Sequence, residues 1–261
     1  MKRKEHECRI TNPYRDINGI VCLYIDGLRQ SGKERSETAV QGAEATLQQT
    51  AIPENYYTEN SKVTDVMRDP AYGDYGHLIF PVDIAISEDL ELKDVEDILP
   101  WYSEVNPKKT VEIVNYMKER VTDGEQIFYD IYSEEEKEAD PAKEDTGLFF
   151  FRGDPGAKTA IVNAGGGFMY VAAMHDSFPQ ALELAKNGYN AFALIYRPGA
   201  DTACEDLARA IAYLHEHAQE LQIDMTDYSL WGGSAGARMA AWLGSYGTAY
   251  FGEEEYPAPA A

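Results

Sequence analysis

Apolar and polar positions follow two rhythms along the second half of this chain. Short apolar runs bounded by glycine, proline or charged residues predict β-strands at residues 126–132, 147–152, 159–163, 191–196 and 228–231. Between the later runs, apolar residues recur at helical spacing and predict helices at residues 178–187, 202–219 and 235–246. Strands alternating with helices favour an α/β fold with a doubly wound, mostly parallel sheet, preceded here by two antiparallel strands. The loops after the parallel strands should then gather at one edge.

The pattern before residue 126 is weaker. Residues 107–121 predict a helix, because Asn106 can cap it, Pro107 suits its first turn and Gly124 can end it. The Gly-, Asp- and Tyr-rich residues 63–76 predict a loop, as does the charged run 133–145, and residues 19–25 predict a strand. We therefore divide the chain into an unassigned N-terminal segment 1–60, an N-terminal extension 61–125 with one helix packing on the sheet, and a core 126–261.

Composition narrows the range of partners. The 261 residues are 44% hydrophobic, which is ample for a buried core, and carry a net charge of −22. Repulsion by this charge argues against nucleic acid or an anionic membrane as a partner. The three cysteines are widely spaced, so we expect them to be unpaired, with Cys204 on a helix. Nothing in the residue spacing indicates a metal site or a cofactor.

The N-terminus bears on localisation. Met1 is followed by basic residues but by no apolar core of a signal peptide, and no run approaches the roughly 20 apolar residues that span a bilayer. As written, the sequence predicts a cytoplasmic protein. A signal peptide lost from upstream of Met1 would instead make it a secreted one.

Ser234 is the candidate catalytic residue. It lies in the G-x-S-x-G pattern formed by Gly232, Ser234 and Gly236, between a predicted strand and a predicted helix. Such a turn holds its serine at positive φ and exposes the hydroxyl, and side chains at the two glycine positions would collide with the strand and the helix. A turn of small residues without a nucleophile is the alternative. The flanking elements favour a catalytic serine.

A second glycine motif, Gly165-Gly166-Gly167, follows the predicted strand 159–163. A dinucleotide-binding loop would need glycine at Tyr170, and a P-loop would need Gly-Lys-Ser/Thr, which this run lacks. From residue 126 onward, the two motifs together resemble the esterase and lipase branch of the α/β-hydrolase family, with Ala164 where many members carry histidine. The variant of the glycine loop is similar to that of carbohydrate esterases.

This resemblance implies a reaction and a site. It implies a serine carboxylic-ester hydrolase that acts through an acyl-enzyme on small-molecule esters, either small or carbohydrate-linked acyl esters. Ser234 would be the nucleophile, and the amides of Gly166 or Gly167 and of Ala235 would form the oxyanion hole. A serine peptidase of the same fold and a non-catalytic binding scaffold are the alternatives.

The catalytic partners of Ser234 are not found in this sequence. In the family, an Asp or Glu and then a His follow the serine along the chain, yet no histidine follows Ser234. Glu253, Glu254 and Glu255 are the acids beyond it, and their run predicts a solvated turn. His175 is a candidate for a contact at the mouth of the site and the one plausible substitute base.

We therefore expect the chain to be a fragment of a longer enzyme, with an α/β-hydrolase sheet that is incomplete at its C-terminus. Alone, such a chain would be weakly active or inactive. The strand before Ser234 would also lie at an exposed sheet edge, which opens a route to self-association.

Overall fold

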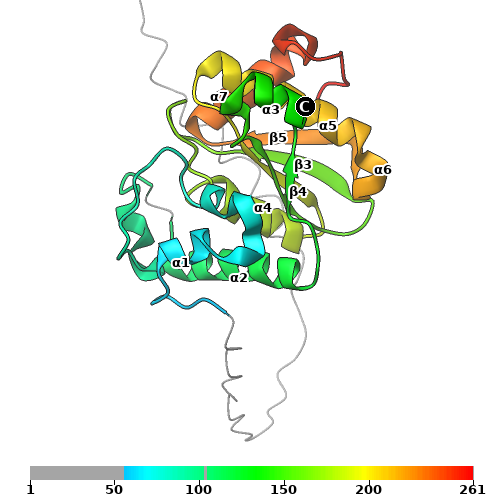
Figure 1. The fold of residues 1–261 in the computed structure, drawn as a ribbon. Helices are drawn as coiled ribbons and strands as arrows, with labels where there is room; N and C mark the ends of the chain where they lie inside the picture. The colour runs from blue at the N-terminus through cyan, green and yellow to red at the C-terminus, as the bar shows by residue number, and fades with distance from the viewer. Residues whose placement is uncertain (1–55, 103–104, 261) are drawn as a thin grey trace, which may run out of the picture. The chain divides into compact units, whose positions relative to one another are not determined.

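A computed structural model describes residues 56–102 and 105–260 of the chain (Figure 1). The strand predicted at residues 19–25 and two of the three cysteines, Cys8 and Cys22, lie outside these described residues. Cys204 is buried and unpaired on a helix, as predicted. In the described part, no helix is both long and apolar enough to cross a membrane.

The fold is built on a five-stranded mixed sheet with the order β1-β2-β4-β3-β5. Its strands are β1 (Phe128–Asp130), β2 (Gly147–Phe151), β3 (Lys158–Asn163), β4 (Asn190–Ile195) and β5 (Asp224–Gly232). β1 and β2 are antiparallel to each other, and β2 is antiparallel to β4, whereas β4, β3 and β5 run parallel. The predicted α/β class and the two antiparallel strands at the start of the sheet are therefore confirmed.

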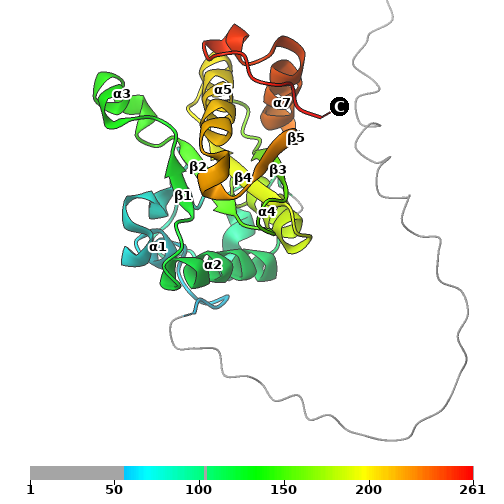
Figure 2. The same ribbon diagram turned by 90° about the vertical axis from the view of Figure 1, so that its right-hand side faces the viewer.

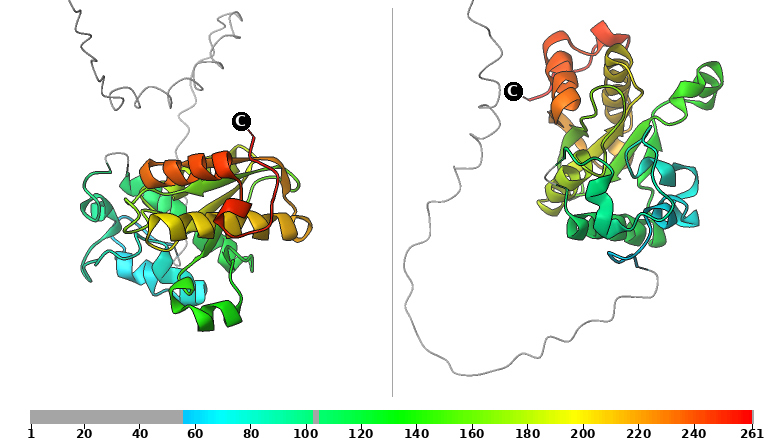
Figure 3. Two further views of the ribbon diagram at one scale, coloured as in Figure 1. Left: turned by 90° about the horizontal axis from the view of Figure 1, so that it is seen from above. Right: turned by 90° about the vertical axis from the view of Figure 1, so that its left-hand side faces the viewer.

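Helices cover the sheet on both faces (Figures 1 and 2). α4 (Ser177–Lys186) lies on one face, and α5 (Ala200–Glu216) and α7 (Ser234–Tyr246) lie side by side on the other (Figure 3). The short helix α6 (Ala218–Leu221) follows α5, so the single helix predicted over residues 202–219 is interrupted at His217. Because both faces are covered, every residue of β2 and β4 is buried, which explains their unbroken apolar runs.

The N-terminal extension contains α2 (Pro107–Thr122), the helix that the sequence predicts there. The side chain of Asn106 caps it by accepting from the amides of Lys108 and Lys109. Tyr116 stacks on Phe151 of β2 with ring centroids 5.7 Å apart, so α2 contacts the sheet.

Two predicted loops contain helical turns instead. Residues 63–78 form α1 (Val63–Met67) and the 3₁₀ helix η3 (Pro70–Leu78), because widely spaced apolar residues such as Val66 and Leu78 are buried among the polar ones. The charged run forms α3 (Glu134–Ala139) and the 3₁₀ helix η5 (Pro141–Lys143), and a reciprocal capping box between Ser133 and Glu136 begins α3. α3 buries none of its residues and stands out from the sheet in Figures 2 and 3.

Two further 3₁₀ helices complete the described part, η4 (Leu92–Asp97) and η6 (Ala249–Phe251). After η6 the chain returns along β5, where the amide of Ala260 donates to the carbonyl of Tyr228 at 2.8 Å. β5 is the last strand in the sheet order. Self-association through this edge stays a prediction.

Candidate functional site

The strand β5 turns directly into α7 at Ser234. Ser234 has φ of +47°, the left-handed region that residues with a Cβ rarely adopt, and its side chain is exposed. A Cβ on Gly236 would overlap the carbonyl oxygen of Asn163 at the end of β3, and a Cβ on Gly232 would overlap the backbone of Gly236. The predicted crowding at both glycines is confirmed. The tight packing of strand against helix forces the turn that presents Ser234.

The loop after β3 lies against this turn. Asn163 joins the two, since its Nδ2 donates to the carbonyl of Trp231 at 2.9 Å and its own carbonyl accepts from the amide of Gly233 at 3.3 Å. The hydroxyl of Tyr196 at the end of β4 donates to the carbonyl of Ala164 at 2.7 Å. The start of the loop is therefore fixed by hydrogen bonds to both neighbouring strands, through the backbone of β5 and the side chain of Tyr196 after β4.

Backbone amides remain available in this region. Gly166 has φ of +145° and its Cβ position is filled by the carbonyl of Tyr170, so only glycine fits there. Within residues 56–102 and 105–260, the amides of Gly166, Gly167 and Ala235 have no hydrogen-bond acceptor. Ala235 also lies in the first turn of α7, where the helix dipole favours negative charge. The structure therefore leaves free backbone donors in the two segments where the sequence predicts an oxyanion hole.

A half-buried carboxylate supports the glycine loop, and the sequence did not identify it. Asp176 directly precedes α4, a position where aspartate often caps a helix, but its side chain does not cap α4. It accepts from the amide of Gly165 at 2.7 Å and from Nε2 of Gln180 at 3.0 Å. Burial raises its pKa, and the hydrogen bond from Gly165 opposes that rise.

His175 points away from solvent. Its ring is 3% exposed, and Nε2 lies 3.0 Å from the carbonyl oxygen of Val95, so Nε2 carries the proton. Burial lowers its pKa to about 4. Because the ring is enclosed, we retain neither a substrate contact nor a general-base role for it.

The other described histidines also lie in packing or surface contacts. His77 pairs with Asp145, His215 packs between Tyr228 and Tyr256, and His217 stacks on Tyr213. The predicted solvated turn at residues 253–255 holds for two of its acids only. Glu253 is largely buried, lies 3.7 Å from Arg209 and has a pKa raised by burial.

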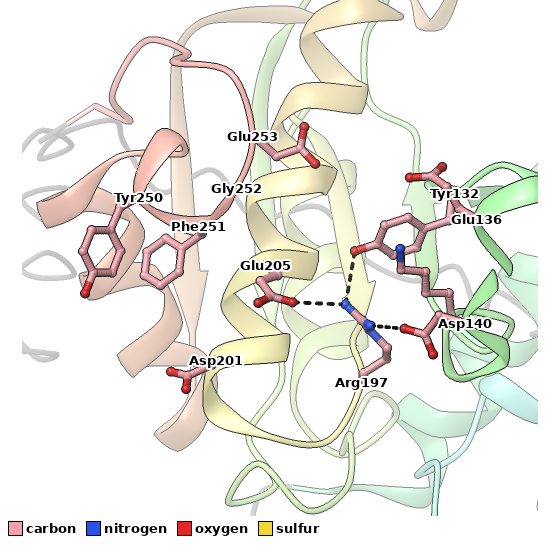
Figure 4. A pocket seen from close by; sticks show the side chains of 11 residues that line it. Tyr132, Glu136, Asp140, Arg197, Asp201, Glu205, Tyr250, Phe251, Gly252 and Glu253 are labelled. Carbon is pink, nitrogen blue, oxygen red and sulfur yellow. Dashed lines mark hydrogen bonds and ion pairs between the residues drawn. The ribbon is translucent and has the colours of Figure 1, made fainter.

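A polar pocket of about 760 Å³ lies beside Arg197, between α3, α5 and η6 (Figure 4). Arg197 is held there by Asp140, Glu205, the hydroxyl of Tyr132 and the buried Asp206. Asp206 and Glu205 thus both form salt bridges with Arg197. None of the predicted catalytic residues lines this pocket, so we assign no reaction to it.

Comparisons with known proteins find similarity in the region that contains the two glycine motifs. The BD-FAE family model matches residues 153–256, a span that contains both. A search of curated proteins found no match to this chain.

Similar solved structures include esterase 2 of Thermogutta terrifontis, at 26% identity over 38% of this chain and 41% of that chain, with a TM-score of 0.36. An acetyl ester-xyloside bifunctional hydrolase of Caldicellulosiruptor lactoaceticus is similar at 26% identity, over 46% of each chain, with a TM-score of 0.42. This chain therefore spans less than half the length of either protein. Over residues 153–256, the predicted resemblance to α/β-hydrolase esterases is confirmed by the match to the BD-FAE family.

Proposed function

We propose that this chain carries the nucleophile and the oxyanion hole of a serine carboxylic-ester hydrolase. The observation that carries the proposal is the exposed Ser234 at φ of +47°, beside loop amides without an acceptor in the described part. A left-handed serine is strained, and such strain persists where the surrounding structure enforces it. An ordinary turn between strand and helix would not need it.

The proposed reaction proceeds through an acyl-enzyme. Oγ of Ser234 bonds to the carbonyl carbon of the ester, the carbonyl π electrons move to its oxygen, and the Oγ proton passes to a base. The amides of Gly166 or Gly167 and of Ala235 donate to the resulting oxyanion, each contributing on the order of 3 kcal/mol in the transition state. The intermediate then collapses: the carbonyl re-forms, the bond to the alkoxide oxygen breaks, and the base returns its proton to the leaving alcohol. Water then hydrolyses the acyl-enzyme and frees Ser234.

The base for this reaction is not found among residues 56–102 and 105–260. None of the histidines among the described residues forms a hydrogen bond with Ser234, and the resemblance places the catalytic acid and histidine after the serine in chain order. We propose that both lie on a segment outside the printed 261 residues, so that this chain is a fragment of the enzyme. The substrates we propose are small or carbohydrate-linked acyl esters, a choice supported by the BD-FAE match.

Chemical rescue tests this proposal on the chain as it is. Imidazole at high concentration can replace a missing histidine as the base, so it should accelerate hydrolysis of 4-nitrophenyl acetate and phosphonylation by a fluorophosphonate probe. Ser234→Ala should remove the protein-dependent part of both rates and leave only the reaction of free imidazole. Peptide mapping should place the phosphonyl group on Ser234.

Ser245→Ala is the matched control, because Ser245 is an exposed serine of the same helix. It should leave both rates unchanged. Equal rates for the unmodified chain and Ser234→Ala, with imidazole present, would contradict the serine assignment. That outcome would favour the alternative, a non-catalytic binding scaffold. The lack of a hydrogen bond from a described histidine to Ser234 is the observation that favours this alternative.

A further inference from the structure

The segment Trp101–Tyr102 comes from the N-terminal extension and reaches the glycine loop. The indole Nε1 of Trp101 donates to the hydroxyl of Tyr170 at 2.8 Å, and the two rings meet edge to face with centroids 6.3 Å apart. Trp101 itself is 65% exposed. Tyr102 is half-buried, and its ring packs edge-on against His175. The segment is thus held by Tyr170 and His175, which both follow the glycine loop in the chain.

The hydroxyl of Tyr102 lies close to Ser234. A methyl group placed on Gly165 would lie 2.7 Å from Oη of Tyr102, 3.1 Å from Cβ of Ser234 and 3.2 Å from Oδ2 of Asp176. These three groups therefore close around the position that a Cβ on residue 165 would take, and they leave too little room for a methyl group there. The hydroxyl of Tyr102 and the side chain of Ser234 therefore approach the same point beside Gly165.

The surroundings keep this hydroxyl protonated. Burial raises the pKa of Tyr102, and the nearby carboxylate of Asp176 raises it further. A phenol that keeps its proton can donate a hydrogen bond throughout a reaction at neutral pH. A donor held beside developing negative charge stabilises the transition state more than the ground state.

We propose that Tyr102 is a further catalytic residue, whose hydroxyl donates a hydrogen bond to the carbonyl oxygen of an ester bound at Ser234. The inference rests on the proposed function, and it adds a side-chain donor to the backbone amides. Tyr102 keeps its proton in the step, since the Oγ proton passes to the base. The N-terminal extension thereby contributes a residue to the reaction.

Tyr102→Phe tests this role, because it removes the hydroxyl and keeps the ring that packs on His175. In the presence of imidazole, we expect the Ser234-dependent kcat to fall about ten- to a hundred-fold, with KM changed little. The rate of phosphonylation of Ser234 should fall similarly, because the phosphoryl oxygen of the probe needs the same donors. The midpoint of thermal unfolding should stay close to that of the unmodified chain.

Tyr213→Phe is the matched control, since Tyr213 is a half-buried tyrosine that stacks on His217. It should leave kcat unchanged. An unchanged kcat in Tyr102→Phe, or a rise in KM alone, would overturn the catalytic role of Tyr102 while leaving Ser234 as the nucleophile. A Ser234→Ala variant as fast as the unmodified chain would instead overturn the proposed function, and this inference with it.

Discussion

Two adjacent side chains beneath the glycine loop respond to burial in opposite ways. Burial depresses the pKa of His175 to about 4 and raises the pKa of Asp176, because a buried site disfavours the charged form of each. Asp176 nevertheless accepts two hydrogen bonds, whereas Nδ1 of His175 has no partner within the described part of the chain. His175 therefore has no contact that would favour its protonation other than the carbonyl of Val95.

This difference predicts how stability depends on pH. The pKa of His175 is about 4 in the folded chain against 6.5 for a free side chain, so its contribution to stability is present above pH 6.5 and lost as the pH falls towards 4. Between pH 6.5 and pH 5, the loss should be about 2 kcal/mol. His175→Gln should remove this loss. Urea denaturation at several pH values measures the free energy of unfolding of both proteins. If that free energy fell equally steeply with decreasing pH in His175→Gln, His175 would not be the group responsible.

At the level of single elements, the sequence predicts most of what lies between β2 and α7. Short, fully buried strands and amphipathic helices have clear periodicities, and the turn at Ser234 has a local glycine pattern. The sequence does not predict the 3₁₀ helix at residues 70–78, because its apolar residues follow no periodic pattern. Burial of Tyr72 and Leu78 stabilises it. Elements stabilised mainly by tertiary contacts leave little local signal.

Two glycines of α7 should respond oppositely to the same substitution. Gly236→Ala would drive a methyl group into the carbonyl of Asn163, so we expect it to separate α7 from β3 and to destabilise the chain by about 2 kcal/mol or more. Gly244→Ala meets only Pro259 at 3.8 Å and should stabilise the helix by about 0.5 to 1 kcal/mol. Denaturation midpoints of the two variants check this. A similar stability change in both would contradict the packing described at Ser234.

Across the whole described part, the contacts around the candidate site join residues distant in sequence. His175 bonds the carbonyl of Val95, and Tyr102 reaches Gly165 from the N-terminal extension. The sequence predicts the serine and the glycine loop, because each has a local pattern. It does not predict Tyr102 or Asp176, since a single tyrosine or aspartate carries no signal of what it meets in the fold.

The buried ion pair between Arg197 and Asp206 joins the end of β4 to α5. The same two side chains make long-range contacts with Tyr132 after β1 and with Asp140 after α3. Asp206 is fully buried and accepts from the amide and the guanidinium of Arg197. Asp206→Ala should therefore cost about 3 to 5 kcal/mol, because it leaves a buried cation without its main partner.

The double variant Arg197→Met with Asp206→Leu separates two contributions to stability. One is the free-energy cost of leaving Arg197 without its partner, and the other is the net stabilisation by the ion pair. The double variant should recover most of the lost stability, since it removes the unpaired charge and keeps apolar volume. Glu88→Gln, which breaks the exposed pair with Arg68, is the matched control and should have a far smaller effect. If the double variant were as unstable as Asp206→Ala, the pair itself, and not the unpaired charge, would hold these segments together.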